Sequence, residues 1–91
     1  MPKVILTAQV DDAQKWEAGF RTHGDVLRTY DLNGPVEYSI VGNDVALYME
    51  TKDIDKLKRT MQLPETAAAM AFDGVQRNTV KVFVMEKKMD A

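Results

Sequence analysis

The stretch VEYSIVGNDVALYME, Val36 to Glu50, decides the fold that this sequence predicts. Apolar and polar side chains alternate on either side of the turn GND, and a period of two is typical of β-strands. The turn contains residue types that tolerate a positive φ angle. The stretch therefore predicts an antiparallel hairpin with strands over residues 36–41 and 45–50.

The sequence before this hairpin predicts a strand and then a helix. KVILTAQV, Lys3 to Val10, is rich in β-branched residues, and Asp11 with Gln14 has the spacing of a capping box. At 100° per residue, five side chains then fall within an arc of about 80°. They are Trp16, Phe20, His23, Leu27 and Tyr30. Gly19 and Gly24 interrupt this helix, which indicates a bend or a close approach of another segment.

The sequence after the hairpin predicts a broken helix and a last strand. Asp53 is placed to cap a helix whose inward positions are Ile54, Leu57 and Met61. Pro64 lacks an N–H group, so PETAAAMAF should form a new short helix that ends at Asp73 and Gly74. TVKVFVMEK, residues 79–87, predicts the final strand. The order βαββαβ predicts one α+β domain over residues 1–91, a ferredoxin-like antiparallel four-stranded sheet with helices on one face.

Both faces of this predicted sheet carry apolar residues, although a face exposed to solvent should be mainly polar. Val4, Leu6, Tyr38, Leu47 and their neighbours of equal parity form an apolar face suited to the helices. The opposite face also carries apolar residues from every strand: Ile5, Val41, Tyr48, Phe83 and Met85. A sheet face open to solvent normally alternates cleanly, so this mixed face predicts a homodimer that packs through the sheet. Scattered apolar surface residues are the other interpretation.

Composition excludes several classes of function. The net charge is −2 and the basic residues are dispersed, which argues against nucleic acid as a partner. No apolar run approaches the roughly 20 residues of a membrane span, and we expect no membrane association and a cytoplasmic protein. One histidine and no cysteine leave little with which to bind a metal, and no nucleotide-binding motif occurs. We expect no cofactor.

The whole pattern resembles a known superfamily. The motif W-x3-F-x2-H on the first helix, the hairpin, and PETAAAMAFDGV before the last strand are similar to the dimeric α/β-barrel proteins. These include proteins like the antibiotic-biosynthesis monooxygenases, small isomerases, polyketide cyclases and uncharacterised small proteins. The resemblance covers residues 3–87. It implies two sheets packed face to face into a barrel, with helices outside and any ligand cavity between sheet and helices.

His23 is the candidate catalytic residue. An imidazole titrates near neutral pH, so the ring could serve as a base or proton shuttle. Alternatively, one ring nitrogen bonds a strand residue and the ring packs beside Trp16 as part of the core. If His23 is catalytic, it must line a cavity with a second polar group in reach. Glu37 and Glu50 share a face and could form a carboxylate pair, although solvated or interface roles are common for such residues.

A small apolar or aromatic molecule is the ligand that the predicted cavity would suit. The candidate ligand-binding residues are Trp16, Phe20, Leu27, Tyr38, Met49, Met61 and Met70. Flexible methionine thioethers adapt to apolar guests, but they also fill irregular gaps in small cores. Three functions stay open: a binding protein without catalysis, a cofactor-free monooxygenase, isomerase or cyclase-type enzyme using His23, and a structural or partner-binding dimer.

Overall fold

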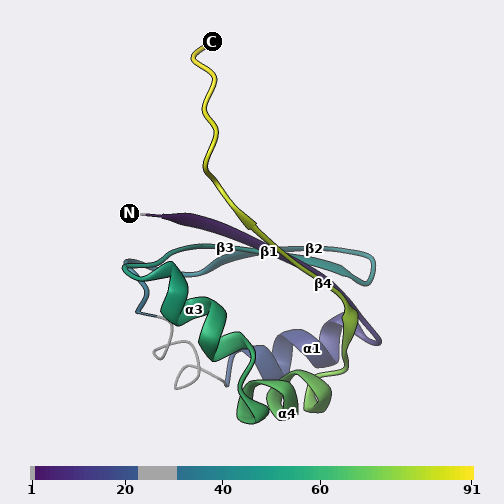
Figure 1. Cartoon of the computed structure of the whole chain (residues 1–91). Coiled ribbons are helices and arrows are strands. Elements are labelled where there is room, and N and C mark those ends of the chain that lie inside the picture. Colours follow the sequence, from purple (N-terminus) through teal and green to yellow (C-terminus); the bar gives the residue numbers. More distant parts are fainter. Residues whose placement is uncertain (1, 23–30) are drawn as a thin grey trace.

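The computed structural model describes residues 2–22 and 31–91. Its elements, in chain order, are β1 (Lys3–Val10), α1 (Ala13–Phe20), β2 (Glu37–Val41), β3 (Asp44–Glu50), α3 (Ile54–Met61), α4 (Pro64–Phe72) and β4 (Val75–Val84). The strands form one sheet of order β2-β3-β1-β4 in which every neighbouring pair is antiparallel. All three described helices cover the same face of this sheet, and the other face is bare (Figure 1). The predicted ferredoxin-like α+β fold is confirmed.

The register of the strands decides which side chains the helices cover. Leu6 lies opposite Leu47 on β3 and opposite Val82 on β4, and Leu47 lies opposite Tyr38 on β2. Directly opposed residues share a face, so the predicted apolar parity points toward the helices. The buried core consists of Val4, Leu6, Ala8, Val10, Trp16, Val45, Leu47, Met49 and Leu57.

The first helix is capped one residue later than predicted. Asp12, not Asp11, has the extended backbone of an N-cap, and its Oδ1 accepts from the backbone N–H groups of Gln14 at 3.0 Å and Lys15 at 3.2 Å. The Asp11 carboxylate instead accepts from Gln76 Nε2 at 3.1 Å on the neighbouring strand β4. The capping-box assignment of Asp11 was wrong because two adjacent aspartates match the same local pattern.

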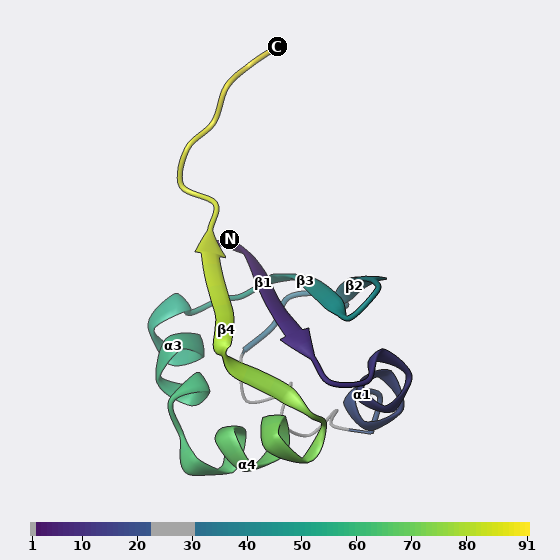
Figure 2. The same cartoon turned by 90° about the vertical axis from the view of Figure 1, so that its right-hand side faces the viewer.

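The broken second helix is confirmed. Asp53 caps α3 by accepting from the Lys56 N–H at 3.1 Å, and Leu57 is buried beneath it. Pro64 occupies the first turn of α4, where a missing N–H costs nothing. The Thr66 hydroxyl donates to the Thr60 carbonyl at 2.6 Å and so links the two helices across the break. Figure 2 shows α4 below β4, with α3, the helix before it, to the left of that strand.

The last strand begins and ends earlier than predicted. β4 starts at Val75 rather than Thr79 and ends at Val84 rather than Lys87. Its register against β1 shifts between Thr7 and Gln9, and the Thr79 hydroxyl bridges this irregularity. Its Oγ accepts from the Gln9 N–H at 2.8 Å and donates to the Gln76 carbonyl at 2.6 Å. The polar residues 76–78 are typical of a loop, but an edge strand with one solvated side tolerates them.

The remaining residues predicted for the first helix, His23, Gly24, Leu27 and Tyr30, lie outside the described residues. None of the described helices has the length and apolar character needed to cross a membrane. After β4 the chain runs away from the sheet as an extended segment (Figure 1).

Candidate ligand cavity

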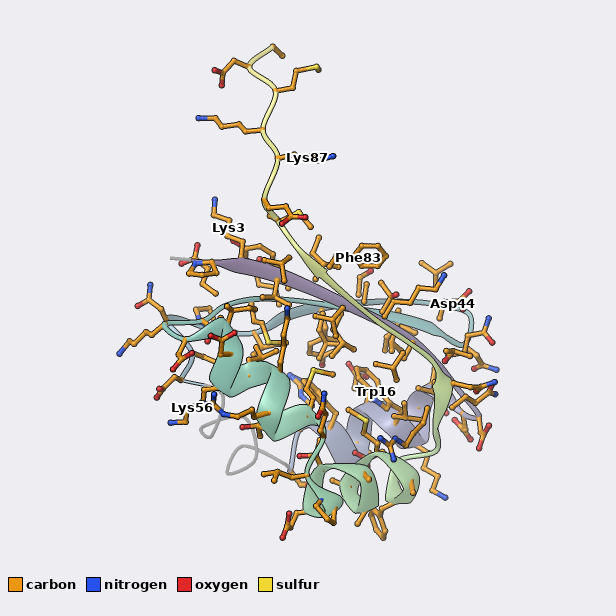
Figure 3. All side chains as sticks on the ribbon, in the orientation of Figure 1. Lys3, Trp16, Asp44, Lys56, Phe83 and Lys87 are labelled. Atoms are coloured by element: carbon orange, nitrogen blue, oxygen red, sulfur yellow. The ribbon has the colours of Figure 1, made fainter. Side chains whose placement is uncertain are left out.

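An apolar cavity of about 80 Å³ lies between the sheet, α1 and α4. β1 and β3 supply its floor with aliphatic side chains and Met49, while α1 contributes Trp16 and Phe20. Met70 of α4 and Val80 of β4 complete the apolar wall. Trp16 lies in the space between the sheet and the helices (Figure 3). The cavity is therefore built where three elements meet that are distant in sequence.

One face of α4 forms the far wall of the cavity. Thr66, Ala69, Met70 and Asp73 all line it, and their spacing of i, i+3, i+4 and i+7 places them on one side of a helix. Of these four residues, only Met70 was predicted from the sequence to bind a ligand. A helical period of 3.6 residues counted from Thr66 could have identified the other three residues. This period is not visible in the sequence, because the alanine-rich helix is apolar on nearly every side.

Three aromatic rings form a cluster at the α1 side of the cavity. The rings of Trp16 and Phe20 stack with centroids 4.9 Å apart and planes inclined by 13°. Tyr38 packs edge-on against both rings, at 5.8 Å from Trp16 and 5.4 Å from Phe20. Offset-stacked and edge-to-face pairs are the favoured aromatic geometries. Tyr38 therefore packs against the two rings that line the cavity but does not line the cavity itself.

Tyr38 is held in this position by an acidic residue of α1. Its hydroxyl donates a hydrogen bond of 2.6 Å to Glu17 Oε2. This bond, and to a lesser degree desolvation, raises the pKa of Tyr38 above its ordinary value of 10.0, because the neutral phenol is the donor. At neutral pH, Tyr38 is therefore a neutral donor that fixes one edge of the aromatic cluster.

Among the described residues that line the cavity, Asp73 is the acidic one, and it was not predicted as a site residue. It follows α4 as its C-cap, and only 5% of its surface is exposed. It packs against Gly19 of α1 so closely that a Cβ atom at position 19 would lie 2.8 Å from Asp73 Cγ and nearer still to Oδ1. Of the two alternatives predicted at Gly19, a bend or a close approach, the structure shows the close approach, and the Asp73 carboxyl group makes it.

The structure brings together some of the predicted ligand-binding residues and separates others. Trp16, Phe20, Met49 and Met70 line one cavity. Met61 instead packs, partly buried, against the core outside the cavity lining. His23 and Leu27 lie outside the described residues.

The opposite face of the sheet carries the residues predicted to form a dimer interface. Ile5 lies opposite both Tyr48 and Phe83, so these three side chains share the bare face. Phe83 is 46% exposed and points away from the helices (Figure 3), and Met85 is 47% exposed. Val41 is 73% exposed at the end of the β2–β3 hairpin.

The two glutamates considered as a catalytic pair lie on either side of Tyr48 on this bare face. Glu37 is opposite Tyr48 in the register, and the Tyr48 hydroxyl donates to Glu50 Oε1 at 3.2 Å. Desolvation, followed by the charge of Glu50, raises the pKa of Tyr48. Glu50 also accepts from Asn33 Nδ2 at 3.3 Å. Within the described residues, no group of histidine and acidic side chains is arranged to hold a metal ion.

Solved structures share this fold over almost the whole chain. No protein-family model and no curated protein sequence matches this chain. A crystal structure of an antibiotic biosynthesis monooxygenase superposes with a TM-score of 0.67 at 15% identity, covering 98% of this chain and 100% of that one. SnoaB from Streptomyces nogalater, a cofactor-independent oxygenase, superposes with a TM-score of 0.68 at 14% identity, covering 98% and 94%.

This chain has the antibiotic biosynthesis monooxygenase fold. An EthD family protein from Bacillus halodurans shares it as well, with a TM-score of 0.58 at 19% identity, covering 97% of this chain and 99% of that one. The predicted structural resemblance is confirmed. Because one fold can host unrelated chemistries, this fold alone does not assign an activity; the cavity is the feature of this chain that bears on function.

Proposed function

We propose that this protein binds a small apolar or aromatic molecule in the cavity between the sheet, α1 and α4. The observation that supports this most directly is an interior space of about 80 Å³ whose wall is almost entirely aliphatic, aromatic and thioether side chains. Ligand pockets of proteins combine such a lining with few polar groups. The walls of Trp16 and Phe20 suit a flat ring.

The size of the cavity limits the ligand. An apolar cavity of about 150 Å³ in another protein stays dry and binds benzene. The present space is smaller, so a single ring would enter with some movement of the wall. Met49 and Met70 supply that movement, because an unbranched thioether side chain changes rotamer at little cost.

Filling the cavity tests this function. Ala69 lines the cavity, whereas Ala68 of the same helix is exposed, so Ala69→Leu and Ala68→Leu form a matched pair. Phenol, toluene and indole would be titrated against each variant by calorimetry and thermal unfolding. A ligand at 100 times its Kd stabilises the protein by about 2.7 kcal/mol. We expect this stabilisation in the parent chain and in Ala68→Leu, and its loss in Ala69→Leu.

Two outcomes would contradict the binding proposal. One is the absence of binding by any of the three probes to the parent chain, which would favour a structural or partner-binding dimer. The other is equal binding to the parent chain and to Ala69→Leu, because the ligand would then occupy a different place.

The same proposal includes a homodimer that packs through the bare sheet face. Support comes from the exposed apolar side chains Phe83 and Met85, and from Ile5 and Tyr48 beside them. A monomer rarely leaves a connected apolar area of this kind in contact with water.

A cofactor-free enzyme is the second candidate, with His23 as the base. Two observations favour it: the fold is shared with SnoaB, described as a cofactor-independent oxygenase, and a buried carboxyl group lies in the cavity wall at Asp73. Proton abstraction requires a base within hydrogen-bond reach of the substrate proton, and a polar group in the cavity wall would orient that substrate. His23→Gln should then abolish dioxygen consumption with a bound phenol and leave its Kd unchanged. Equal dioxygen consumption by the parent chain and His23→Gln, or none by either, would exclude this role.

A further inference from the structure

We propose that the homodimer packs in one orientation, with the acidic half of the bare sheet face of each copy covering the basic half of the other. This inference rests on the homodimer of the proposed function and specifies how the two copies meet. Its basis is the distribution of charge across the four strands, whose order β2-β3-β1-β4 places β2 and β4 at opposite edges.

Charges of opposite sign occupy opposite halves of this face. In the strand register, its acidic side chains, Glu37, Asp44 and Glu50, lie on β2 and β3, and its basic side chains, Lys3 and Lys81, lie on β1 and β4. All of these side chains are exposed except Glu50, which is half-buried. Each edge strand therefore carries one charge on this face, negative for Glu37 on β2 and positive for Lys81 on β4.

The two edge charges cannot neutralise each other within one chain. Neighbouring strands are about 4.8 Å apart, so β2 and β4 are separated by three spacings, about 14 Å. Side chains that stand perpendicular to the sheet do not bridge such a distance. In the part of the chain that the structure describes, neither Glu37 nor Lys81 belongs to an ion pair. Both charges are therefore available to a second copy.

Two-fold symmetry offers two ways to pack the bare faces of identical chains. An axis across the strands lays each strand on its own copy, so that acid meets acid and base meets base at the edges. An axis along the strands lays β2 on β4 and β3 on β1, so that Glu37 lies near Lys81 of the second copy, twice in each dimer. Like charges in contact cost several kcal/mol, so the second orientation is favoured. It also lays Tyr48 over Ile5 of the second copy, because these residues share one row of the register.

Charge reversal tests this orientation. The dimer Kd would be measured by analytical ultracentrifugation for the parent chain, Glu37→Lys, Lys81→Glu and the double variant, with Lys58→Glu at an exposed position of α3 as the control. We expect each single reversal to raise the Kd at least about tenfold, because it brings like charges together twice. The double variant restores unlike pairs and should return the Kd to within about threefold of the parent value. Lys58→Glu should leave the Kd unchanged.

Mixing the two single variants gives a second measurement. An equimolar mixture of Glu37→Lys and Lys81→Glu should form mixed dimers in excess of either homodimer, which native mass spectrometry detects when one variant is isotope-labelled. An unchanged Kd in both single variants, or no recovery in the double variant, would overturn the inference while the homodimer would stand. Preferential pairing of Lys81→Glu with the parent chain would also overturn it, because Lys81 would then face its own copy. A monomeric parent chain would instead overturn the homodimer itself.

Discussion

Gly19 and Asp73 are coupled because α1 and α4 approach each other without room for a methyl group at position 19. Glycine normally weakens a helix relative to alanine through its backbone entropy. Here the absent side chain makes space for a buried carboxyl group, so steric contact outweighs helix propensity. The contact joins two residues that are 54 positions apart in the sequence.

This coupling predicts opposite effects of one substitution in two backgrounds. Gly19→Ala should destabilise the parent chain by about 1–3 kcal/mol, the usual cost of overpacking. In an Asp73→Ala background the same change should be neutral or stabilise by up to about 1 kcal/mol, because only helix propensity then remains. Urea unfolding of the four proteins gives both values, and Ala18→Gly at an exposed site calibrates propensity. Stabilisation by Gly19→Ala in the parent chain would contradict the assigned contact.

The Glu17–Tyr38 hydrogen bond predicts a pH dependence. Because the pKa of Tyr38 is raised in the folded chain, its contribution to stability is complete below the ordinary value of 10.0 and is lost as pH rises through the raised pKa. Glu17→Gln should bring the pKa of Tyr38 down, since the bond to Glu17 is the largest cause of the shift. An NMR titration of the ring carbons measures this. Tyr48 is an internal control, because its pKa is raised mainly by desolvation and should not respond.

At the scale of elements, the irregularity of β4 depends on one hydroxyl group. Thr79 both accepts from the Gln9 N–H and donates to the Gln76 carbonyl, so it replaces ladder hydrogen bonds where the register shifts. A hydroxyl-bearing side chain at position 79 therefore supplies hydrogen bonds where the pairing of β1 and β4 is interrupted.

Removing that hydroxyl should loosen the junction of β1 and β4. Thr79→Val is expected to lower the free energy of unfolding by about 1 kcal/mol and to speed amide exchange at Gln9. Thr79→Ser retains the hydroxyl and serves as the control. Slow exchange at Gln9 in Thr79→Val would show that the hydroxyl is not needed to close the irregularity.

At the scale of the whole molecule, the bare sheet face predicts the assembly state. Phe83→Glu places a charge among Ile5, Tyr48 and Met85 and should convert a dimer to a monomer. Phe72→Glu changes a 73% exposed phenylalanine on α4 and should leave the mass in solution unchanged. Native mass spectrometry or light scattering reports the mass. An unaltered dimer in Phe83→Glu would refute this interface, and a monomeric parent chain would refute the dimer.

The sequence by itself determined the order of elements, the hairpin, the break at Pro64 and the face of the sheet that the helices cover. These features depend on short-range physics: side-chain alternation, caps, a missing N–H and turn residues. The same local patterns could not choose between Asp11 and Asp12 as the cap, or detect that residues 75–78 continue β4.

Only the tertiary structure decided the composition of the cavity. Asp73 ends a helix and Gly19 interrupts another, and each has an ordinary local explanation that conceals their contact. Tyr38 shares the inner parity of the sheet, but it packs edge-on against Trp16 and Phe20 and does not line the cavity, contrary to the prediction from the sequence. Such neighbours are set by how α1 and α4 pack on the sheet, which depends on contacts between residues far apart along the chain.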